Sequence, residues 1–181
     1  MYEKFMTVMG DYLAIVYHLS GAIRQQLWAN IESCYELAEN EPALLVMTME
    51  VIELQERLQA RLIEQTIQRA IAEGKDPDDE VDKLMPEDLK AEALKRLRSM
   101  LERRLRESFV ARHLEAANNC GHVEATLISA TPMLVELTIF KNEIAPCFPP
   151  EYEVVKIALE IFEDHIRPQV TSLYEREGDL E

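Results

Sequence analysis

A long, unbroken helical period in the first half of the chain constrains its fold most strongly. After Pro42, neither glycine nor proline occurs before Gly74. Large apolar residues recur there at steps of three and four: Leu44, Met47, Val51, Leu54, Leu58 and Leu62. This is the period of one helical face, and it predicts an α-helix over residues 42–72. At about 1.5 Å per residue, this helix would be roughly 45 Å long. A compact globule of 181 residues has little room for it, so the sequence predicts an elongated bundle or a rod.

Three further stretches carry the same period. A helix after the expected cap at Ser20, ending near Asn40, has its stripe at Ile23, Leu27, Ile31, Cys34 and Ala38. A helix beginning at Pro86 has its stripe at Leu94, Leu97, Leu101, Leu105 and Phe109. A last helix opening at Pro150 has its stripe at Tyr152, Val155, Leu159, Phe162 and Ile166, and we expect Pro168 to bend or end it. With a sharp corner over 39–42, these helices predict an all-α, elongated antiparallel bundle that forms one segment over residues 1–181.

Two segments are less regular. Residues 74–86 hold five acidic side chains, two prolines and a glycine, a composition typical of a solvated loop. The chain also breaks its helical pattern around Asn118, Asn119 and Gly121. Residues 123–143 then combine β-branched residues with Pro132, so a short strand and a helix kinked at Pro132 are both consistent with the pattern. The kinked helix is favoured, because Val123, Leu127, Leu134 and Leu137 fit one helical face.

Composition excludes several classes of function. The net charge of -15 would repel a nucleic acid, so no nucleic-acid partner is expected. The five glycines are too scattered for a phosphate-binding loop. The three cysteines are widely spaced, as in a protein of the reducing cytoplasm. The longest apolar stretch, 125–140, is shorter than the roughly 18 to 20 residues that a membrane-spanning helix needs.

No constellation of catalytic or metal-binding residues is evident. The four histidines are scattered, and no pair has the spacing of a metal-binding helix face. Cys120 and His122 would supply only two of the four ligands of a zinc site. Asp164 and His165 are adjacent on a predicted helix, so their side chains diverge by about 100°. We therefore expect no enzymatic activity, no metal and no cofactor.

The candidate interaction residues are basic or aromatic. Residues 90–112 hold eight of the 19 basic side chains and only three glutamates. The candidate partner contacts of this helix are Arg96, Arg103, Arg104 and Arg106. This strip would dock an acidic protein or an anionic lipid headgroup, unless the acidic segment 74–88 and neighbouring Glu-rich helices neutralise it within the fold. Internal neutralisation is the favoured interpretation. Trp28 and Phe148 are further candidates for a partner contact, although large aromatic residues at such positions more often anchor the core.

The order of several motifs resembles a known family. Gln26, Leu27 and Trp28 precede a helix that opens with Glu41, Pro42, Ala43 and Leu44, and Ala111, Arg112 and His113 follow later. The most specific run is Cys147, Phe148, Pro149, Pro150, Glu151, Tyr152 and Glu153. In this order they resemble the exocyst subunit Sec-six, also called exocyst component three, over residues 10–174. The resemblance covers only a middle part of a family member, which implies that the chain is a fragment of a longer rod, a partial gene model or a shortened relative.

The resemblance implies a non-catalytic subunit of the exocyst complex, which tethers secretory vesicles to the plasma membrane before fusion. It implies a cytoplasmic protein that is recruited peripherally to exocytic sites of the plasma membrane. Its expected partners are other exocyst subunits and membrane-fusion proteins, with peripheral contact to the membrane. The alternative is a lipid-binding or membrane-remodelling helical protein related to the same family.

Overall fold

The computed structural model describes the backbone of residues 2–84, 88–117 and 122–178, and the side chains of residues 12–84, 88–110 and 124–171. Every regular element in these ranges is helical, which confirms the all-α prediction. The α-helices are α1 (Tyr2–Glu32), α2 (Cys34–Asn40), α3 (Pro42–Glu73), α4 (Pro77–Asp82), α5 (Leu89–Ala117), α6 (His122–Ile139) and α7 (Val154–Gly178). A π-helical turn (Phe140–Ile144) and two 3₁₀ turns (Ala145–Cys147 and Pro150–Tyr152) connect α6 to α7.

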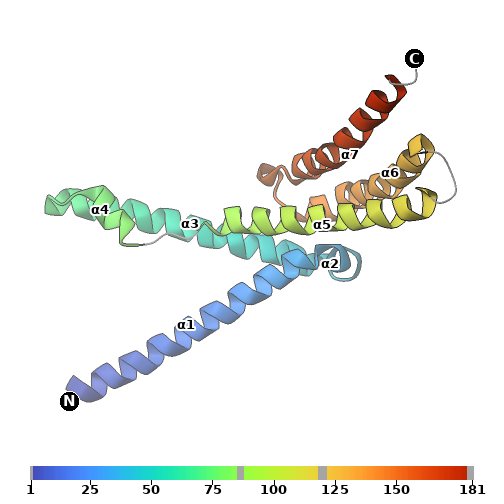
Figure 1. Ribbon diagram of the computed structural model, residues 1–181. Helices are drawn as coiled ribbons and strands as arrows, with labels where there is room; N and C mark the ends of the chain where they lie inside the picture. Colours follow the sequence, from blue (N-terminus) through green and yellow to red (C-terminus); the bar gives the residue numbers. More distant parts are fainter. Residues whose placement is uncertain (1, 85–87, 118–121, 179–181) are drawn as a thin grey trace.

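The helices meet in the middle of an elongated molecule and diverge at both ends (Figure 1). The N-terminal part of α1 extends away from α3, whose own C-terminal part continues outward to α4. At the opposite end, α5 and α6 run antiparallel side by side, and α7 leaves them at an angle. The elongated antiparallel bundle predicted from the sequence is therefore confirmed.

The core lies where these helices converge. Fully buried residues come from α1, α2, α3, α5, α6, α7 and the turns after α6, and include Ile31, Ile52, Leu101 and Ile144. A buried polar link crosses between α1 and α3: the Asn30 amide donates to the Thr48 hydroxyl at 2.8 Å. Because a buried amide and hydroxyl must find partners, this bond helps to fix the point at which α1 crosses α3.

The first two helices differ from the prediction. We expected one helix from Ser20 to Asn40, but α1 begins at Tyr2, and Ser20 lies within it. No residue before Ser20 interrupts the helical backbone, so Ser20 has no helix end to cap. A break at Ser33 separates α1 from α2. The corner predicted over 39–42 is confirmed, because Glu41 leaves the helical conformation with φ -141° and ψ 58° and Pro42 opens α3.

The length of α3 is confirmed, but the buried face of its first half is not the predicted one. The prediction buried the stripe that contains Met47, Val51 and Leu54, whereas these residues are exposed. The residues buried against α1, α2 and the turns after α6 are Leu45, Thr48, Met49 and Ile52. This part of α3 is apolar on two faces, and tertiary packing selected the one that periodicity did not favour.

The acidic segment is partly helical. Gly74 ends α3 with a left-handed backbone at φ 69°. Asp76 then caps α4, since its carboxylate accepts from the Asp78 backbone N–H at 2.9 Å. Pro77 fits the first turn of α4, and the acidic residues that suggested a loop are favourable at a helix N-terminus. The prediction of a loop throughout 74–86 is therefore wrong for 77–82.

The second half of the chain follows the prediction more closely. In α5, Leu97, Leu101 and Leu105 are buried as expected, and Asp88 caps the helix by accepting from the Ala91 N–H at 2.7 Å. The predicted break around 118–121 lies outside the described residues. The segment after it is helical rather than a strand, with Pro132 inside α6.

The predicted faces of α6 and α7 are only partly correct. Leu127 and Leu134 are exposed, and α6 buries Ala125, Ser129 and Met133 instead. In α7 the buried positions are Val154, Ala158 and Ile161, whereas Leu159 is half exposed. Pro168 does not end α7, which continues to Gly178.

Candidate functional site

The central part of α5 is held to its neighbours by an ionic and aromatic cluster. The Arg104 guanidinium donates to the Glu136 carboxylate on α6 at 2.6 Å and 3.3 Å. It also lies over the ring of Tyr35 on α2, 3.8 Å from the ring centroid. Charge-assisted pairs with two donors are among the stronger side-chain hydrogen bonds. Arg104 thus joins α5, α6 and α2.

Other basic residues of α5 are paired in the same way. Arg96 donates to Glu32 on α1 at 2.7 Å and to Glu92 at 2.8 Å, and its guanidinium lies 5.2 Å from the centre of the Trp28 ring. Arg98 reaches Glu160 on α7 at 3.8 Å. The glutamates of neighbouring helices thus neutralise part of the basic strip.

The expected contribution of the acidic segment to this neutralisation is not found among the described ion pairs. Around α4, Lys75 pairs with Glu73 and Lys83 pairs with Glu80. These pairs are local because α4 packs on the outer end of α3, away from the middle of α5. The side chains of Arg103 and Arg106 are exposed, and their role as partner contacts stays a prediction.

The two aromatic candidates lie in the core. Trp28 is 9% exposed and Phe148 is 6% exposed. Each therefore packs against the fold in this structure, and a partner contact by either residue also stays a prediction. Cys34 is fully buried in the same core, and burial raises the pKa of its thiol to about 12. A thiol with that pKa is protonated at neutral pH and is a poor nucleophile.

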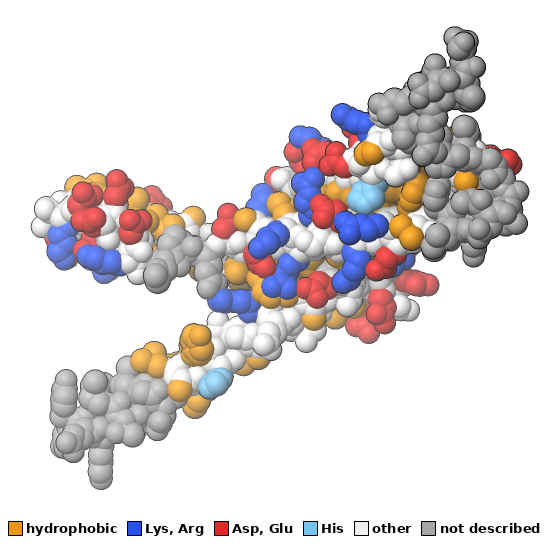
Figure 2. Space-filling model, viewed as in Figure 1, with side chains coloured by type: hydrophobic (Ala, Val, Ile, Leu, Met, Phe, Trp, Pro, Cys, Tyr) orange, Lys and Arg blue, Asp and Glu red, His pale blue; other side chains and the backbone are white. Residues whose placement is uncertain are grey.

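The least expected feature is the exposed apolar surface of α1. Between residues 12 and 23 this helix has no Asp, Glu, Lys or Arg. Its large apolar side chains there are 44% to 79% exposed: Tyr12, Leu13, Ile15, Val16, Tyr17, Leu19 and Ile23. At about 100° per residue they spread over roughly 200° of the helix circumference, about twice the stripe that one packing partner covers. Figure 2 shows hydrophobic side chains along the α1 arm, whereas charged residues gather over the centre and the α4 tip.

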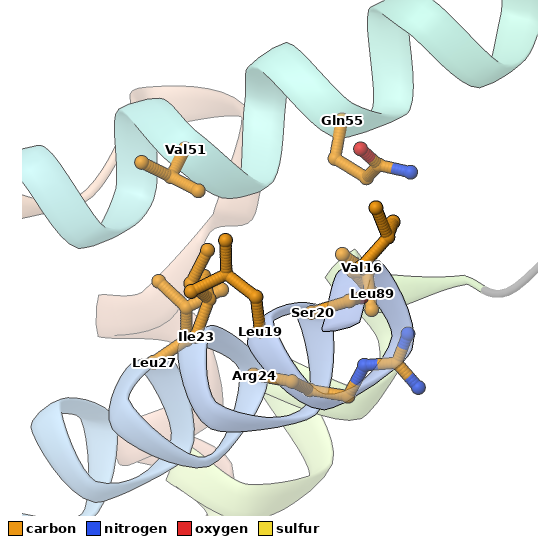
Figure 3. Close-up of a pocket in the computed structure, with 9 residues that line it drawn as sticks. All are labelled: Val16, Leu19, Ser20, Ile23, Arg24, Leu27, Val51, Gln55 and Leu89. Carbon is orange, nitrogen blue, oxygen red and sulfur yellow. The ribbon is translucent and has the colours of Figure 1, made fainter. Parts of the chain in front are cut away.

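The exposed stripe of α3 faces this surface across a cleft. Val51 and Gln55 point from α3 toward Val16, Leu19 and Ile23 on α1 (Figure 3). Leu89 of α5 also lines this cleft, whose volume is about 380 Å³. Beyond it, Leu54, Leu58 and Leu62 are about half exposed along α3. We call this combined surface the α1–α3 cleft.

The size of this surface sets it apart from ordinary exposed apolar residues. With about 200 Å² of accessible surface for a large apolar residue, the exposed fractions leave on the order of 800 Å² uncovered on α1 alone. The largest apolar patches of monomeric proteins are about 300–600 Å². One side of a standard protein interface is about 800 Å². The surface of α1 is thus as large as one side of a stable interface.

A family model for the exocyst complex component Sec6 matches residues 14–181, nearly the whole chain. The chain belongs to the Sec6 family. The resemblance inferred from the sequence motifs is thereby confirmed. Membership implies that the chain is an exocyst subunit with a role in vesicle tethering and that it assembles with other exocyst subunits. The Sec6 family is structural and non-catalytic, and its complex acts at exocytic sites. No solved structure matches the chain.

Among the residues that the structure describes, no helix is both long and apolar enough to span a membrane. Within the described part of the chain, no three His, Cys, Asp or Glu side chains gather in a way that would hold a metal ion.

Sequence reasoning missed the α1–α3 cleft for two reasons. The predicted first helix begins at Ser20 and so does not include residues 12–19, and the apolar stripe of α3 is predicted to be part of the core. The uncharged run from Tyr12 to Ile23 is the feature that would have indicated it, since a helix that is apolar on more than one face needs more than one partner.

Proposed function

We propose that residues 1–181 act as one helical docking segment of an exocyst subunit, which binds a helix of another exocyst subunit in the α1–α3 cleft. Through the assembled complex, the segment would help to hold secretory vesicles at the plasma membrane before fusion. The observation that carries this proposal is the uncharged, exposed surface of α1 between residues 12 and 23. We further propose that the assembled complex contacts membrane-fusion proteins and the surface of the plasma membrane.

The cleft suits an amphipathic helix better than a flat surface. Apolar side chains line both of its walls, and the two helices that form them diverge toward the ends of the molecule. An incoming helix with apolar residues at steps of three and four would fill the space between them. A charged residue beyond the apolar stripe of α3, such as Arg61, would then favour one register of the incoming helix.

The elongated shape supports the same function. A tether must transmit force between two membranes, and long helices packed along their length resist bending. The paired arginines of α5 tie α1, α2, α6 and α7 together at the centre of the molecule. The diverging parts of α1 and α3 can then contact partners without loosening this centre.

Co-purification with other exocyst subunits tests the proposal. The variant Ile15→Gln with Leu19→Gln places two amides on the α1 surface, where both side chains are more than half exposed. The matched control is Leu127→Gln with Leu159→Gln, which changes two exposed leucines on α6 and α7. Both variants should melt like the parent protein. The α1 variant should lose the other subunits and the control should retain them, whereas equal retention by both variants would overturn the proposal.

Flotation with phosphoinositide-containing vesicles tests the alternative of a lipid-binding protein. Arg96 and Arg104 are already engaged with Glu32 and Glu136, so we expect weak binding by the chain alone. Tight flotation that is lost on replacing Arg103 and Arg106 by Glu would favour the lipid-binding function instead.

A further inference from the structure

The turn before α7 contains the most specific sequence run of the chain and an unusual backbone. The 3₁₀ turn Pro150–Tyr152 is followed by Glu153 with φ 47°, the one positive φ of a non-glycine residue among those described. This conformation is uncommon for a residue with a side chain. It redirects the chain into α7 and leaves Tyr152 next to α3 and the start of α5.

Tyr152 carries a buried hydroxyl group without a partner. The residue is 4% exposed, and its hydroxyl finds no hydrogen-bond partner within the described part of the chain. The Lys90 ammonium lies over the ring, 4.5 Å from its centroid, and does not satisfy the hydroxyl. Native proteins rarely leave a buried polar group unpaired, so such a group calls for an explanation.

The surroundings of this hydroxyl are acidic. Tyr152 lines a pocket of about 350 Å³ together with Glu53, Glu56, Arg57, Lys90 and Glu151. Burial, followed by the charges of Glu53 and Glu56, raises the pKa of the phenol to about 12. The phenol is therefore neutral at physiological pH, and its oxygen can accept a hydrogen bond.

The carboxylates of this pocket differ in their hydrogen bonds and ion pairs. Glu56 accepts from the backbone N–H groups of Leu89 and Lys90 at 3.1 Å and 3.4 Å, so it caps the start of α5. Glu53 is half-buried and Glu151 is exposed at the pocket, and neither has a described ion pair. With three glutamates against Arg57 and Lys90, the pocket has a net negative charge and suits a cation.

We propose that this pocket, which we call the Tyr152 socket, binds an arginine side chain of another subunit. A planar guanidinium has donors in several directions. It can donate to the Glu53 and Glu151 carboxylates and, after a small shift of the whole Tyr152 side chain, to the buried Tyr152 oxygen. The proposed function enters this proposal only as the source of the arginine, which would come from another exocyst subunit. The socket itself lies on a different surface from the α1–α3 cleft.

A titration with single amino-acid derivatives tests the socket directly. N-acetyl-arginine amide is added to the 181-residue protein labelled with ¹³C in its tyrosine rings, and Tyr152→Phe identifies the Tyr152 resonance. N-acetyl-citrulline amide is the matched probe, since it has a similar shape without the charge. We expect a saturable shift of the Tyr152 resonance with the arginine probe only. No saturable shift, or equal shifts with both probes, would overturn the proposal.

Variants separate the contributions of charge and hydroxyl. Glu53→Gln with Glu151→Gln should weaken arginine binding at least about tenfold, because two charged acceptors become neutral. Tyr152→Phe, followed through the Lys90 amide resonance, should weaken binding about fivefold, as expected for one hydrogen bond. Tyr35→Phe is the control, and it should leave binding unchanged. Unchanged binding in the glutamate variant would contradict the proposal.

Stability supplies an independent check. Because the Tyr152 hydroxyl has no partner, Tyr152→Phe should leave the melting temperature unchanged or raise it. A clear fall would mean that the hydroxyl already has a hydrogen-bond partner within the fold. It would then not be free to accept a hydrogen bond from an arginine, and the proposal would lose its main support. The variant Ile15→Gln with Leu19→Gln should still bind the arginine probe, so failure of the socket and failure of the α1–α3 cleft can be told apart.

Discussion

The orientation of α3 predicts a large difference between two neighbouring apolar residues. Ile52 is fully buried, whereas Leu54 is 50% exposed. Changing Ile52 to Ala removes three buried carbons at about 0.8 kcal/mol each and leaves a cavity, so we expect a loss of about 3 to 4 kcal/mol in the free energy of unfolding. Leu54→Ala removes the same number of carbons from a half-exposed side chain and leaves no closed cavity. Its expected loss is about 1 kcal/mol or less.

Urea unfolding followed by far-UV circular dichroism measures both losses. The dependence on urea should have the same slope in both variants, so that a change of midpoint reports stability alone. Leu58→Ala is the control, because Leu58 is exposed to the same extent as Leu54. If Leu54→Ala and Leu58→Ala cost as much as Ile52→Ala, the stripe predicted from the sequence would be buried after all, and the account of the α1–α3 cleft would be refuted.

Three further outcomes are expected. Phe148→Ala should cost about 3 to 5 kcal/mol in urea unfolding because the ring is buried, and an unchanged midpoint would contradict that burial. A double-mutant cycle on Arg104 and Glu136 should give a coupling energy of about 1 kcal/mol that falls in high salt, whereas zero coupling would contradict their bond. Burial raises the pKa of the Cys34 thiol from 9.0 to about 12. As the pH rises above 9, the thiol therefore loses its proton in the unfolded chain but keeps it in the folded chain. The free energy of unfolding should then fall between pH 9 and about pH 12. Cys34→Ala should make that fall in the urea midpoint shallower, and an equal slope in both proteins would contradict the raised pKa.

The sequence was sufficient to predict the long helices. In α5 one face is clearly apolar and the rest is charged, so Leu97, Leu101 and Leu105 could be assigned to the core from their spacing. Pro42 similarly defined the start of α3. The apolar face of a helix and its first residue depend on the residues of that helix alone, so they could be predicted from the sequence.

The sequence was insufficient where two faces of one helix compete. In α3, both Ile52 and Leu54 lie on apolar faces, and only contact with α1 and α2 decides which is buried. The same competition exposed Leu127 in α6, where the small residues Ala125 and Ser129 allow close packing. The Tyr152 socket was equally hidden, because it joins α3, α5 and the turn before α7. The periodicity of a sequence describes one helix at a time and contains no information on the contacts between helices.

The central claim is that α1 binds another exocyst subunit through residues 12–23. Hydrogen exchange of this chain, alone and in the assembled complex, tests it most directly. In the chain alone, the exposed part of α1 has few packing contacts, so its amides should exchange faster than those around Ile31. Assembly should slow exchange over residues 12–23 and leave the already protected core of α5 unchanged. Equal exchange of residues 12–23 in both states, with protection on α6 or α7 instead, would contradict the claim.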